Sequence, residues 1–310
     1  MTALTTTEAF AHPALFYRGR QEYLRGTLPF IRDGLKHGEP VAVAVPGPNL
    51  TVLQEALAED ATAVHFVDMT EAGRNPGRII PRVLRPFADA HPHTRVRIIG
   101  EPIWPGRSSL EYPACVQHEA LINAAFQGRV ATILCPYDAG RLDDQVLTDA
   151  YATHPVVVAD GRTRPSPSYA PEHIVAHYNQ PLDEAAGTTE AHAFGVDDLP
   201  TARYFAVAQA TGLGLSGTRL DDLALAVAEL TTNSVVHGDG TGNVRVWREG
   251  SHVVCEVRDR GHLTDPLAGR RPPARDQRGG RGLLLVHCLA DLVRIHTGPE
   301  GTAIRCYIGY

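Results

Sequence analysis

Apolar and polar positions in the first half of the chain alternate between two kinds of block. Four short runs rich in Val and Ile are typical of buried strands: 40–46, 63–69, 94–102 and 130–138. Between and before them, apolar residues three and four positions apart indicate helices at 18–38, 49–59, 77–91 and 109–128. Because strands and helices take turns, this half is predicted to be an α/β domain, a mostly parallel sheet with helices on both faces.

The second half of the chain has a different order of elements. Two helical patterns come first, at 197–212 and 218–237, and strands with alternating apolar residues follow. These strands are expected at 243–247, 252–259, 292–298 and 302–309, with a glycine-led helix at 279–292. Helices followed by antiparallel strands predict an α+β sandwich, in which one sheet lies under one layer of helices.

The segment between the two halves is rich in Pro, Gly, Ser and Thr, which is typical of a domain boundary. We therefore predict a first domain over 12–182, a linker over 183–194 and a second domain over 195–310. The first domain has no GxGxxG or GK[ST] motif, so it is expected to be a scaffold of the nucleotide-binding type without a nucleotide motif.

Composition and charge narrow the class of protein. Hydrophobic residues make up 43% and charged residues 21%, as in globular proteins. A net charge of −6 argues against direct binding to nucleic acid or an anionic membrane, since such sites carry a basic surplus. No apolar run reaches the roughly 18 residues that span a bilayer, and no signal peptide is visible at the N-terminus. We expect a cytoplasmic protein.

The cysteines point to the same compartment. There are five, an odd number, and none forms a CxxC pair. This pattern predicts buried free thiols in a reducing cytoplasm, with neither a disulfide framework nor a zinc site. They are Cys115, Cys135, Cys255, Cys288 and Cys306.

One helix of the second half carries a polar stripe that needs an explanation. Glu229, Asn233 and His237 are spaced by four residues, so they share one edge of the helix. A solvated surface is the simplest interpretation of such a stripe. Two later features favour a nucleotide site instead. A strand ends in Asp-Arg-Gly at 259–261, and a glycine-rich run at 278–286 opens a helix, whose N-terminus suits phosphate. The Pro- and Arg-rich stretch between them, 262–277, is interpreted as a mobile lid.

The motifs ELTTNSVVHG, DRG and GGRGLLLV, in this order, resemble the ATP-binding fold of the GHKL superfamily, which includes gyrase and the histidine kinases. The resemblance covers about 195–310 and is closest to the anti-sigma factor serine/threonine kinases of the RsbW and SpoIIAB type. It implies that ATP and Mg²⁺ are the cofactors. A true histidine kinase is not expected, because no phosphoacceptor helix hairpin precedes the domain.

The resemblance assigns roles to individual residues. Asn233 corresponds to the Mg²⁺ ligand, and Glu229 to the general base that accepts the proton of a serine hydroxyl. Asp259 corresponds to the acceptor for the adenine amino group. His237 could lie on the phosphate side or simply close the helix C-terminus. The implied nucleotide-binding residues are Asn233, His237, Asp259, Gly261, Arg278, Gly279, Gly280, Arg281, Gly282 and Leu283.

The function implied by the resemblance is that of a kinase in transcription control. Such a protein phosphorylates a STAS-type anti-sigma antagonist and binds a sigma factor, and it can form a homodimer. The alternative is a non-catalytic or ATP-gated switch that acts only by binding its partner. A third interpretation is a metabolic α/β enzyme in the first half, but this half has no nucleophile–base pair and no cofactor motif that such an enzyme would need.

The first half resembles the MEDS sensory domain over about 12–180. The stretches that carry this resemblance are FYRGRQEYLRGTLPFIRDGLKHGEPVAVAVP, RIIGEPIWPGR, EALINAAF and LCPYD. It implies a RecA-like sensor that responds to a small-molecule signal and controls the second domain. The residues proposed for a ligand or interdomain surface are Glu101, Trp104, Glu119, Tyr137 and Asp138, although each could be purely structural.

Overall fold

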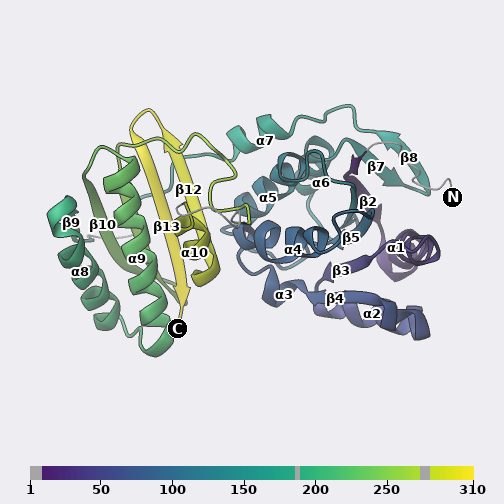
Figure 1. Cartoon of the computed structure of the whole chain (residues 1–310), viewed down its shortest axis with the longest axis horizontal. Coiled ribbons are helices and arrows are strands. Elements are labelled where there is room, and N and C mark those ends of the chain that lie inside the picture. Colours follow the sequence, from purple (N-terminus) through teal and green to yellow (C-terminus); the bar gives the residue numbers. More distant parts are fainter. Residues whose placement is uncertain (1–8, 186–188, 273–279) are drawn as a thin grey trace. The chain divides into compact units, whose positions relative to one another are not determined.

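The computed structural model describes residues 9–185, 189–272 and 280–310 (Figure 1). The chain divides into two compact units, one ending at Tyr178 and the other beginning at Asn179. Each unit has its own sheet. No helix among the described residues is both long enough and apolar enough to cross a membrane.

The first unit is built on an eight-stranded sheet with the order β4-β3-β5-β6-β2-β7-β8, and β1 also pairs with β6. The pairs are parallel except for β7 with β8. The strands are β1 (Phe10–Ala11), β2 (Pro13–Tyr17), β3 (Val41–Val45), β4 (Val64–Asp68), β5 (Val96–Gly100), β6 (Ala131–Asp138), β7 (Val156–Ala159) and β8 (Arg162–Pro165).

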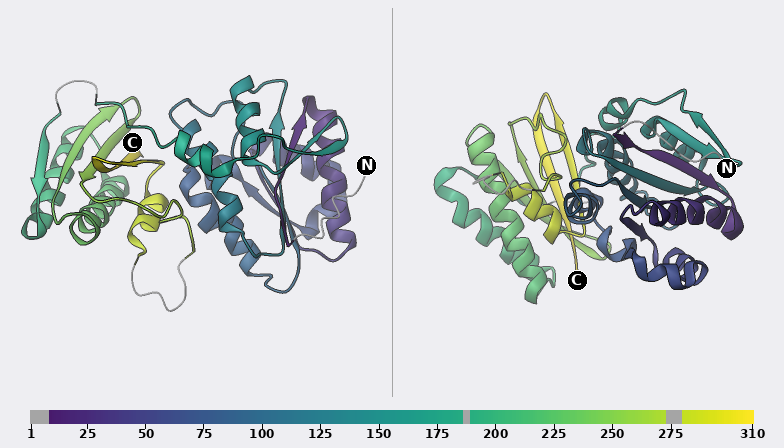
Figure 2. Two further views of the ribbon diagram at one scale, coloured as in Figure 1. Left: turned by 90° about the horizontal axis from the view of Figure 1, so that it is seen from above. Right: turned by 45° about the vertical axis from the view of Figure 1, so that its right-hand side comes forward.

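Helices cover both faces of this sheet. Helices α1 and α2 pack on one face, and α4, α5 and α6 lie on the other (Figure 2). The helices are α1 (Gly19–Lys36), α2 (Gly47–Leu57), α3 (Met69–Ala72), α4 (Arg85–Asp89), α5 (Tyr112–Ala125), α6 (Asp144–Thr153) and α7 (Pro171–His177). Every residue of β3 is buried, as expected for a parallel strand covered from both sides.

The second unit has an antiparallel sheet of five strands in the order β12-β13-β11-β10-β9. Its strands are β9 (Ala191–Phe194), β10 (Gly242–Glu249), β11 (His252–Asp259), β12 (Leu292–Gly298) and β13 (Gly301–Gly309). Its helices are α8 (Leu199–Gly212), α9 (Gly217–His237) and α10 (Gly282–Leu289), all on one side of the sheet (Figure 1).

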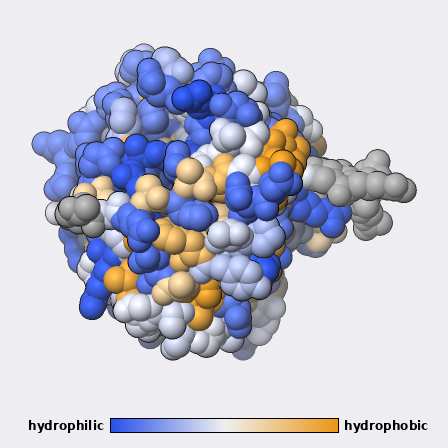
Figure 3. Space-filling view, turned by 90° about the vertical axis from the view of Figure 1, so that its left-hand side faces the viewer, coloured by the Kyte–Doolittle hydropathy of each residue, from blue (hydrophilic) through white to orange (hydrophobic). Residues whose placement is uncertain are grey.

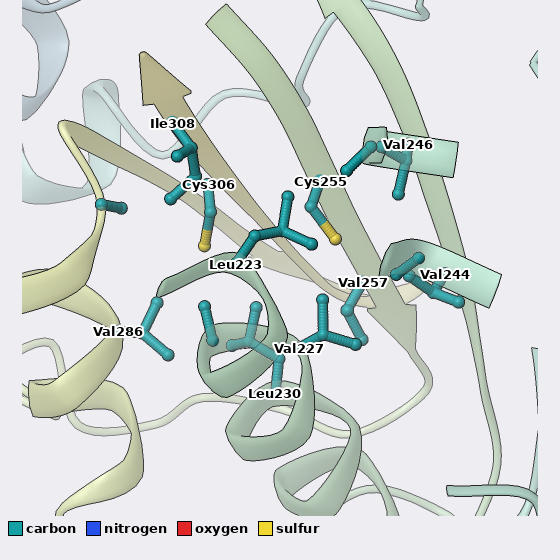
Figure 4. Packing of buried hydrophobic residues seen from close by; sticks show 14 of the residues in the cluster. Leu223, Val227, Leu230, Val244, Val246, Cys255, Val257, Val286, Cys306 and Ile308 are labelled. Carbon is teal, nitrogen blue, oxygen red and sulfur yellow. The ribbon is translucent and has the colours of Figure 1, made fainter. Parts of the chain in front are cut away.

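The core of the second unit lies between α9 and the sheet (Figure 4). Leu223, Val227 and Leu230 recur at helical spacing and point toward alternate strand residues such as Cys255 and Val257. Helix α9 ends before Gly238, where any Cβ would lie 2.4 Å from the carbonyl oxygen of Ser234. This ending places the last turn of the helix beside the Asp-Arg-Gly turn that follows β11.

Apolar side chains are exposed on the second unit on the side that carries α8 and β9. Figure 3 shows apolar side chains scattered among hydrophilic ones on the side that carries α8 and β9. Among the described residues of this unit, large apolar side chains are exposed at Val196, Tyr204, Leu225, Val236 and Tyr310.

The predicted fold class is confirmed for both halves, and each expected strand is present within one or two residues. Four strands outside the predicted runs complete the first sheet: β1, β2, β7 and β8. The helix expected over 77–91 is wrong as a single helix, because a π-helical stretch at Ile80–Leu84 precedes the short α4. Prolines at 81 and 86 remove backbone donors there, so a regular ladder cannot continue.

Residues around the predicted linker also contribute to the second unit. Asn179 donates its side-chain amide to the carbonyl of Thr297 at 2.8 Å and accepts from the Thr297 backbone N–H at 3.0 Å. Strand β9 lies inside the segment 183–194 and pairs with β10. The domain boundaries themselves stay a prediction.

Candidate functional site

A pocket of about 500 Å³ opens in the second unit, between α9, the ends of β11 and β13, the segment 261–272 and the start of α10. Most of the nucleotide-binding residues predicted from the sequence line it: Asn233, His237, Asp259, Gly261, Gly280, Gly282 and Leu283. Arg281 is exposed next to them. Arg278 and Gly279 lie outside the described residues.

The carboxylate of Asp259 is held in one orientation at the end of β11. The hydroxyl of Ser234 on α9 donates to its Oδ2 at 2.6 Å, and the backbone N–H of Gly261 donates to its Oδ1 at 2.8 Å. A carboxylate oxygen can accept more than one hydrogen bond, so both oxygens keep capacity for a ligand donor. Ser234 has no role in the motifs identified from the sequence, so this contact was not predicted.

Two glycines let the elements around the pocket approach closely. A Cβ added to Gly282 would lie 2.5 Å from a carboxylate oxygen of Glu229 and 3.4 Å from the side-chain amide of Asn233. A Cβ on Gly261 would lie 2.6 Å from the Cα of Gly238. The backbone contact at Gly261 leaves no room for a side chain where the Asp-Arg-Gly turn passes α9, whereas at Gly282 the Glu229 side chain would have to move. As a result, the Glu229 carboxylate lies directly beside the first turn of α10, although it does not line the pocket.

The start of α10 presents backbone N–H groups toward the same space. Gly280 has a φ of +74°, the left-handed region that favours glycine, and Gly282 begins the helix. The first N–H groups of a helix have no partner within that helix. This arrangement suits an anionic group such as phosphate.

Apolar side chains and a threonine pair form the rest of the pocket. Leu230, Val257 and Ile304 contribute apolar walls. The hydroxyl of Thr302 donates to the carbonyl of Gly261 at 2.8 Å and lies 2.9 Å from the hydroxyl of Thr297. The threonines therefore fix the turn that carries Asp259. The sequence analysis missed them, because only the pairing of β12 with β13 brings them to this turn.

The segment predicted to be a mobile lid is described only as far as Pro272, and this part is packed. Leu267 and Arg270 are buried, and Gly269 passes so close to Leu283 that a Cβ would lie 2.7 Å from it. Arg271 lines the pocket and pairs with Asp265. Residues 267–270 are thus packed against the start of α10, and the mobility of the lid stays a prediction.

The remaining member of the polar stripe, His237, is exposed at the C-terminal end of α9 and lines the pocket. Both interpretations of its role stay open. Together the pocket combines apolar walls, one fixed carboxylate, an amide oxygen at Asn233 and a helix N-terminus. These groups fit a purine nucleoside triphosphate. The side chains of Asn233 and the nearby Glu229 offer oxygen ligands of the kind that Mg²⁺ prefers.

A second candidate site lies in the first unit. A cavity of about 350 Å³ opens at the carboxyl ends of β2, β3, β5 and β6, where parallel sheets commonly bind ligands. Three residues proposed from the sequence line it: Glu101, Trp104 and Asp138. Tyr17, Tyr23, Asn49 and Arg141 also line it and were not predicted, because they come from other strand ends and helices.

The buried Glu101 dominates the polarity of this cavity. Burial raises the pKa of its carboxyl to about 8, since hydrogen bonds from Asn49 and Tyr17 only partly offset the loss of water and nearby Asp138 adds to the rise. Asn49 donates to its two oxygens at 3.0 and 2.8 Å. The hydroxyl of Tyr23 is buried with no hydrogen-bond partner among the described residues. The raised pKa favours a neutral carboxyl at the floor of this cavity.

Trp104 is held at the rim of this cavity by a cation–π contact. The guanidinium carbon of Arg107 lies 3.8 Å from the centre of its ring. The other two predicted residues, Tyr137 and Glu119, do not reach the cavity. Tyr137 precedes Asp138 on β6, so it points to the opposite face of the sheet, and Glu119 lies in a separate buried cluster.

Comparison with known protein families gives one match in each half of the chain. Residues 11–155 match the family MEDS, described as the methanogen/methylotroph, DcmR sensory domain. Residues 194–308 match the family described as the histidine kinase-like ATPase domain. The chain thus carries a MEDS domain followed by a histidine kinase-like ATPase domain, which confirms the predicted type of each domain, while the particular kinase branch stays a prediction. An ATPase domain of this type implies ATP binding.

The other comparisons add little. The search of curated proteins gave no match. One similar solved structure contains the RsbU and RsbW domains of Rv1364c from Mycobacterium tuberculosis, at 20% identity and a TM-score of 0.29. The match covers 39% of this chain and 32% of that one, and at this TM-score it supports no conclusion.

Proposed function

We propose that the protein is an ATP-dependent serine/threonine kinase of the anti-sigma type, controlled by a sensory domain. In this proposal the second unit binds Mg-ATP, phosphorylates a serine or threonine of a STAS-type antagonist and binds a sigma factor. The first unit binds a small molecule and biases that activity. The observation that carries the proposal is that Asn233 and Asp259 line one pocket at the start of α10, with the Glu229 carboxylate beside the first turn of that helix.

Each group of the pocket has a role that its chemistry supports. When bound, Mg-ATP would supply the phosphoryl group and the cation that neutralises its charge. Asp259, held by Ser234 and Gly261, would accept a hydrogen bond from the adenine amino group. Asn233 would hold Mg²⁺ through its amide oxygen. Glu229 would accept the proton of the substrate hydroxyl.

The sensory cavity suggests a class of signal. Its volume of about 350 Å³ suits a small molecule, and its walls include Tyr17, Tyr23, Trp104 and prolines. Because Glu101 is protonated at neutral pH, its carboxyl can donate a hydrogen bond without placing a charge in the cavity. A small uncharged molecule with a hydrogen-bond acceptor fits these groups.

Calorimetric titration of ATP into the full-length protein tests the nucleotide site. We expect micromolar binding that depends on Mg²⁺, falls at least tenfold in Asp259→Asn and loses its Mg²⁺ dependence in Asn233→Ala. Thr211→Ala is a suitable control, because the hydroxyl of Thr211 bonds only to its own helix, α8. Absence of binding to the folded wild type at millimolar ATP would remove the basis of the proposal.

Kinase activity needs its own test. The wild type and Glu229→Ala would be incubated with Mg-ATP and purified STAS-domain proteins from the same genome, and phosphoserine or phosphothreonine would be detected by mass spectrometry. We expect phosphorylation by the wild type only. If Glu229→Ala binds ATP and controls the sigma factor as well as the wild type does, the protein is the non-catalytic switch instead.

A further inference from the structure

Four side chains with metal-binding atoms meet in the interior of the first unit: His12, Glu119, Cys135 and His154. All four residues are at most 1% exposed. One ligand atom from each lies within 4.8 Å of every other, so the four atoms surround a single point. Neither the kinase proposal nor the sensory cavity uses this cluster.

Three of the six distances between the donor atoms are close to those of a tetrahedral metal site, and all six are within 4.8 Å. A carboxylate oxygen of Glu119 lies 3.3 Å from Nε2 of His12 and 3.1 Å from Nε2 of His154. The sulfur of Cys135 lies 3.4 Å from the same Nε2 of His12. Ligands about 2.0–2.3 Å from a zinc ion at tetrahedral angles would lie about 3.3–3.7 Å apart.

Three polar atoms at the centre of the cluster lack hydrogen-bond partners among the described residues. Both carboxylate oxygens of Glu119 and Nε2 of His154 are buried with no hydrogen bond to any described residue, because the short contacts among them do not have hydrogen-bond geometry. A buried carboxylate in this state is costly unless a cation neutralises it.

The outer nitrogens of both histidines are held in place. Nδ1 of His12 lies 3.2 Å from the side-chain oxygen of Asn123, and Nδ1 of His154 lies 2.9 Å from the carbonyl of Ala150. A proton on each Nδ1 leaves Nε2 with its lone pair directed at the cluster. Metal-binding histidines usually have such a second hydrogen bond.

We propose that His12, Glu119, Cys135 and His154 form a structural zinc site. Two nitrogens, one oxygen and one sulfur are ligands that Zn²⁺ accepts, and four protein ligands without access to water are typical of structural rather than catalytic sites. Binding would release the proton of the Cys135 thiol to solvent. The ion would join the junction of β1 and β2 to α5, β6 and the end of α6.

The test measures metal in the full-length protein. We expect about one zinc per chain by elemental analysis of the wild type, and at least a tenfold loss in Cys135→Ser and in His154→Ala. Cys115→Ser is the matched control and should keep its zinc, because Cys115 is an equally buried cysteine of α5 outside the cluster.

A second measurement does not depend on variants that could fail to fold. The wild type produced with Co²⁺ should show the absorption band of a thiolate–cobalt bond. The proposal is overturned if the folded wild type takes up neither Zn²⁺ nor Co²⁺, or if Cys135→Ser keeps its full metal content.

Discussion

At the scale of single residues, the ATP pocket depends on a hydroxyl that orients a carboxylate. Ser234 is buried and donates to Asp259, and it lies next to Asn233 in the sequence. One turn of α9 thus contributes both the proposed Mg²⁺ ligand and the group that fixes the proposed adenine acceptor. A variant that removes only the hydroxyl of Ser234 can separate its hydrogen bond to Asp259 from its contribution to packing.

Replacing Ser234 by Ala should weaken ATP binding without unfolding the protein. One hydrogen bond to a charged group would be lost, and since the effect on ATP is indirect we expect roughly 1 kcal/mol, or about a fivefold higher Kd. Thr231→Ala is the control, because the hydroxyl of Thr231 bonds only to carbonyls of α9. Titration calorimetry of both variants measures the difference. An equal loss of affinity in both would assign the effect to the helix rather than to Asp259.

A second prediction at the residue scale concerns the pKa of Glu101. Its pKa is raised by burial to about 8, above the ordinary value of 4.5, so folding favours the protonated form. Below pH 4.5 the protonated Glu101 contributes its full share to the free energy of unfolding. This contribution is lost as the pH rises through 8, and the free energy of unfolding falls by up to about 1.4 kcal/mol per pH unit.

The neutral variant Glu101→Gln should lack this part of the pH dependence. Urea unfolding of the first unit at pH 5 and pH 8 checks the prediction: the wild type should lose more stability than Glu101→Gln between the two values. Equal losses would mean that Glu101 is ionised in the folded protein at pH 5.

At the scale of elements, the second face of the antiparallel sheet carries a buried cluster of charges beside buried apolar side chains such as Val254 and Tyr307. Glu256 on β11 is buried and accepts hydrogen bonds from Arg245 on β10 and Arg305 on β13, both at 2.6 Å, and from Arg258 at 2.7 Å. Burial alone would raise the pKa of Glu256, but these arginines outweigh it and hold the pKa below its usual range.

Removing the charge of Glu256 should therefore destabilise the sheet strongly. Glu256→Gln leaves three arginines without their shared partner, and we expect a loss of roughly 3–5 kcal/mol in the free energy of unfolding. Glu184→Gln is the matched control, because Glu184 pairs with Arg245 and Arg258 but is 70% exposed, so its loss should stay within about 1 kcal/mol. Chemical denaturation measures both. The stabilisation by Glu256 should disappear as the pH falls through its lowered pKa.

The elements predicted correctly from the sequence were those whose apolar residues recur at a regular spacing. Strand β3 and helix α9 carry unbroken apolar patterns, so the hydrophobic effect alone locates them. Strands β1 and β2 were missed because His12 and Pro13 interrupt the pattern, and β9 because its short AHAF run lies in a segment rich in glycine and threonine. Their formation depends on pairing with distant strands.

The same distinction applies to the sites. Glycines and acidic residues of the ATP pocket lie in short motifs, so the sequence gives their positions. The proposed zinc ligands lie as far apart as residues 12 and 154, without any pair of nearby cysteines, and only the fold brings them together. The expectation of no zinc site was based on the spacing of the cysteines alone. Spacing along the sequence does not reveal that these four residues meet in the folded domain.

At the scale of the whole molecule, the two compact units should respond to different ligands. The MEDS domain holds the sensory cavity and the proposed zinc site, and the ATPase domain holds the nucleotide pocket. A ligand that binds only the folded form of one unit raises the stability of that unit.

Calorimetric unfolding of the full-length chain should therefore show two transitions that ligands move separately. Mg-ATP at about one hundred times its Kd would add about 2.7 kcal/mol to the ATPase domain and raise its transition by roughly 10 °C. Asp259→Asn, with at least tenfold weaker binding, should reduce this rise by about half or more at the same ATP concentration. Cys135→Ser should lower only the other transition, since it removes a ligand of the proposed zinc site. If instead a single transition responds to both ATP and Cys135→Ser, the two domains unfold together, and a signal bound to one can reach the other through their shared stability.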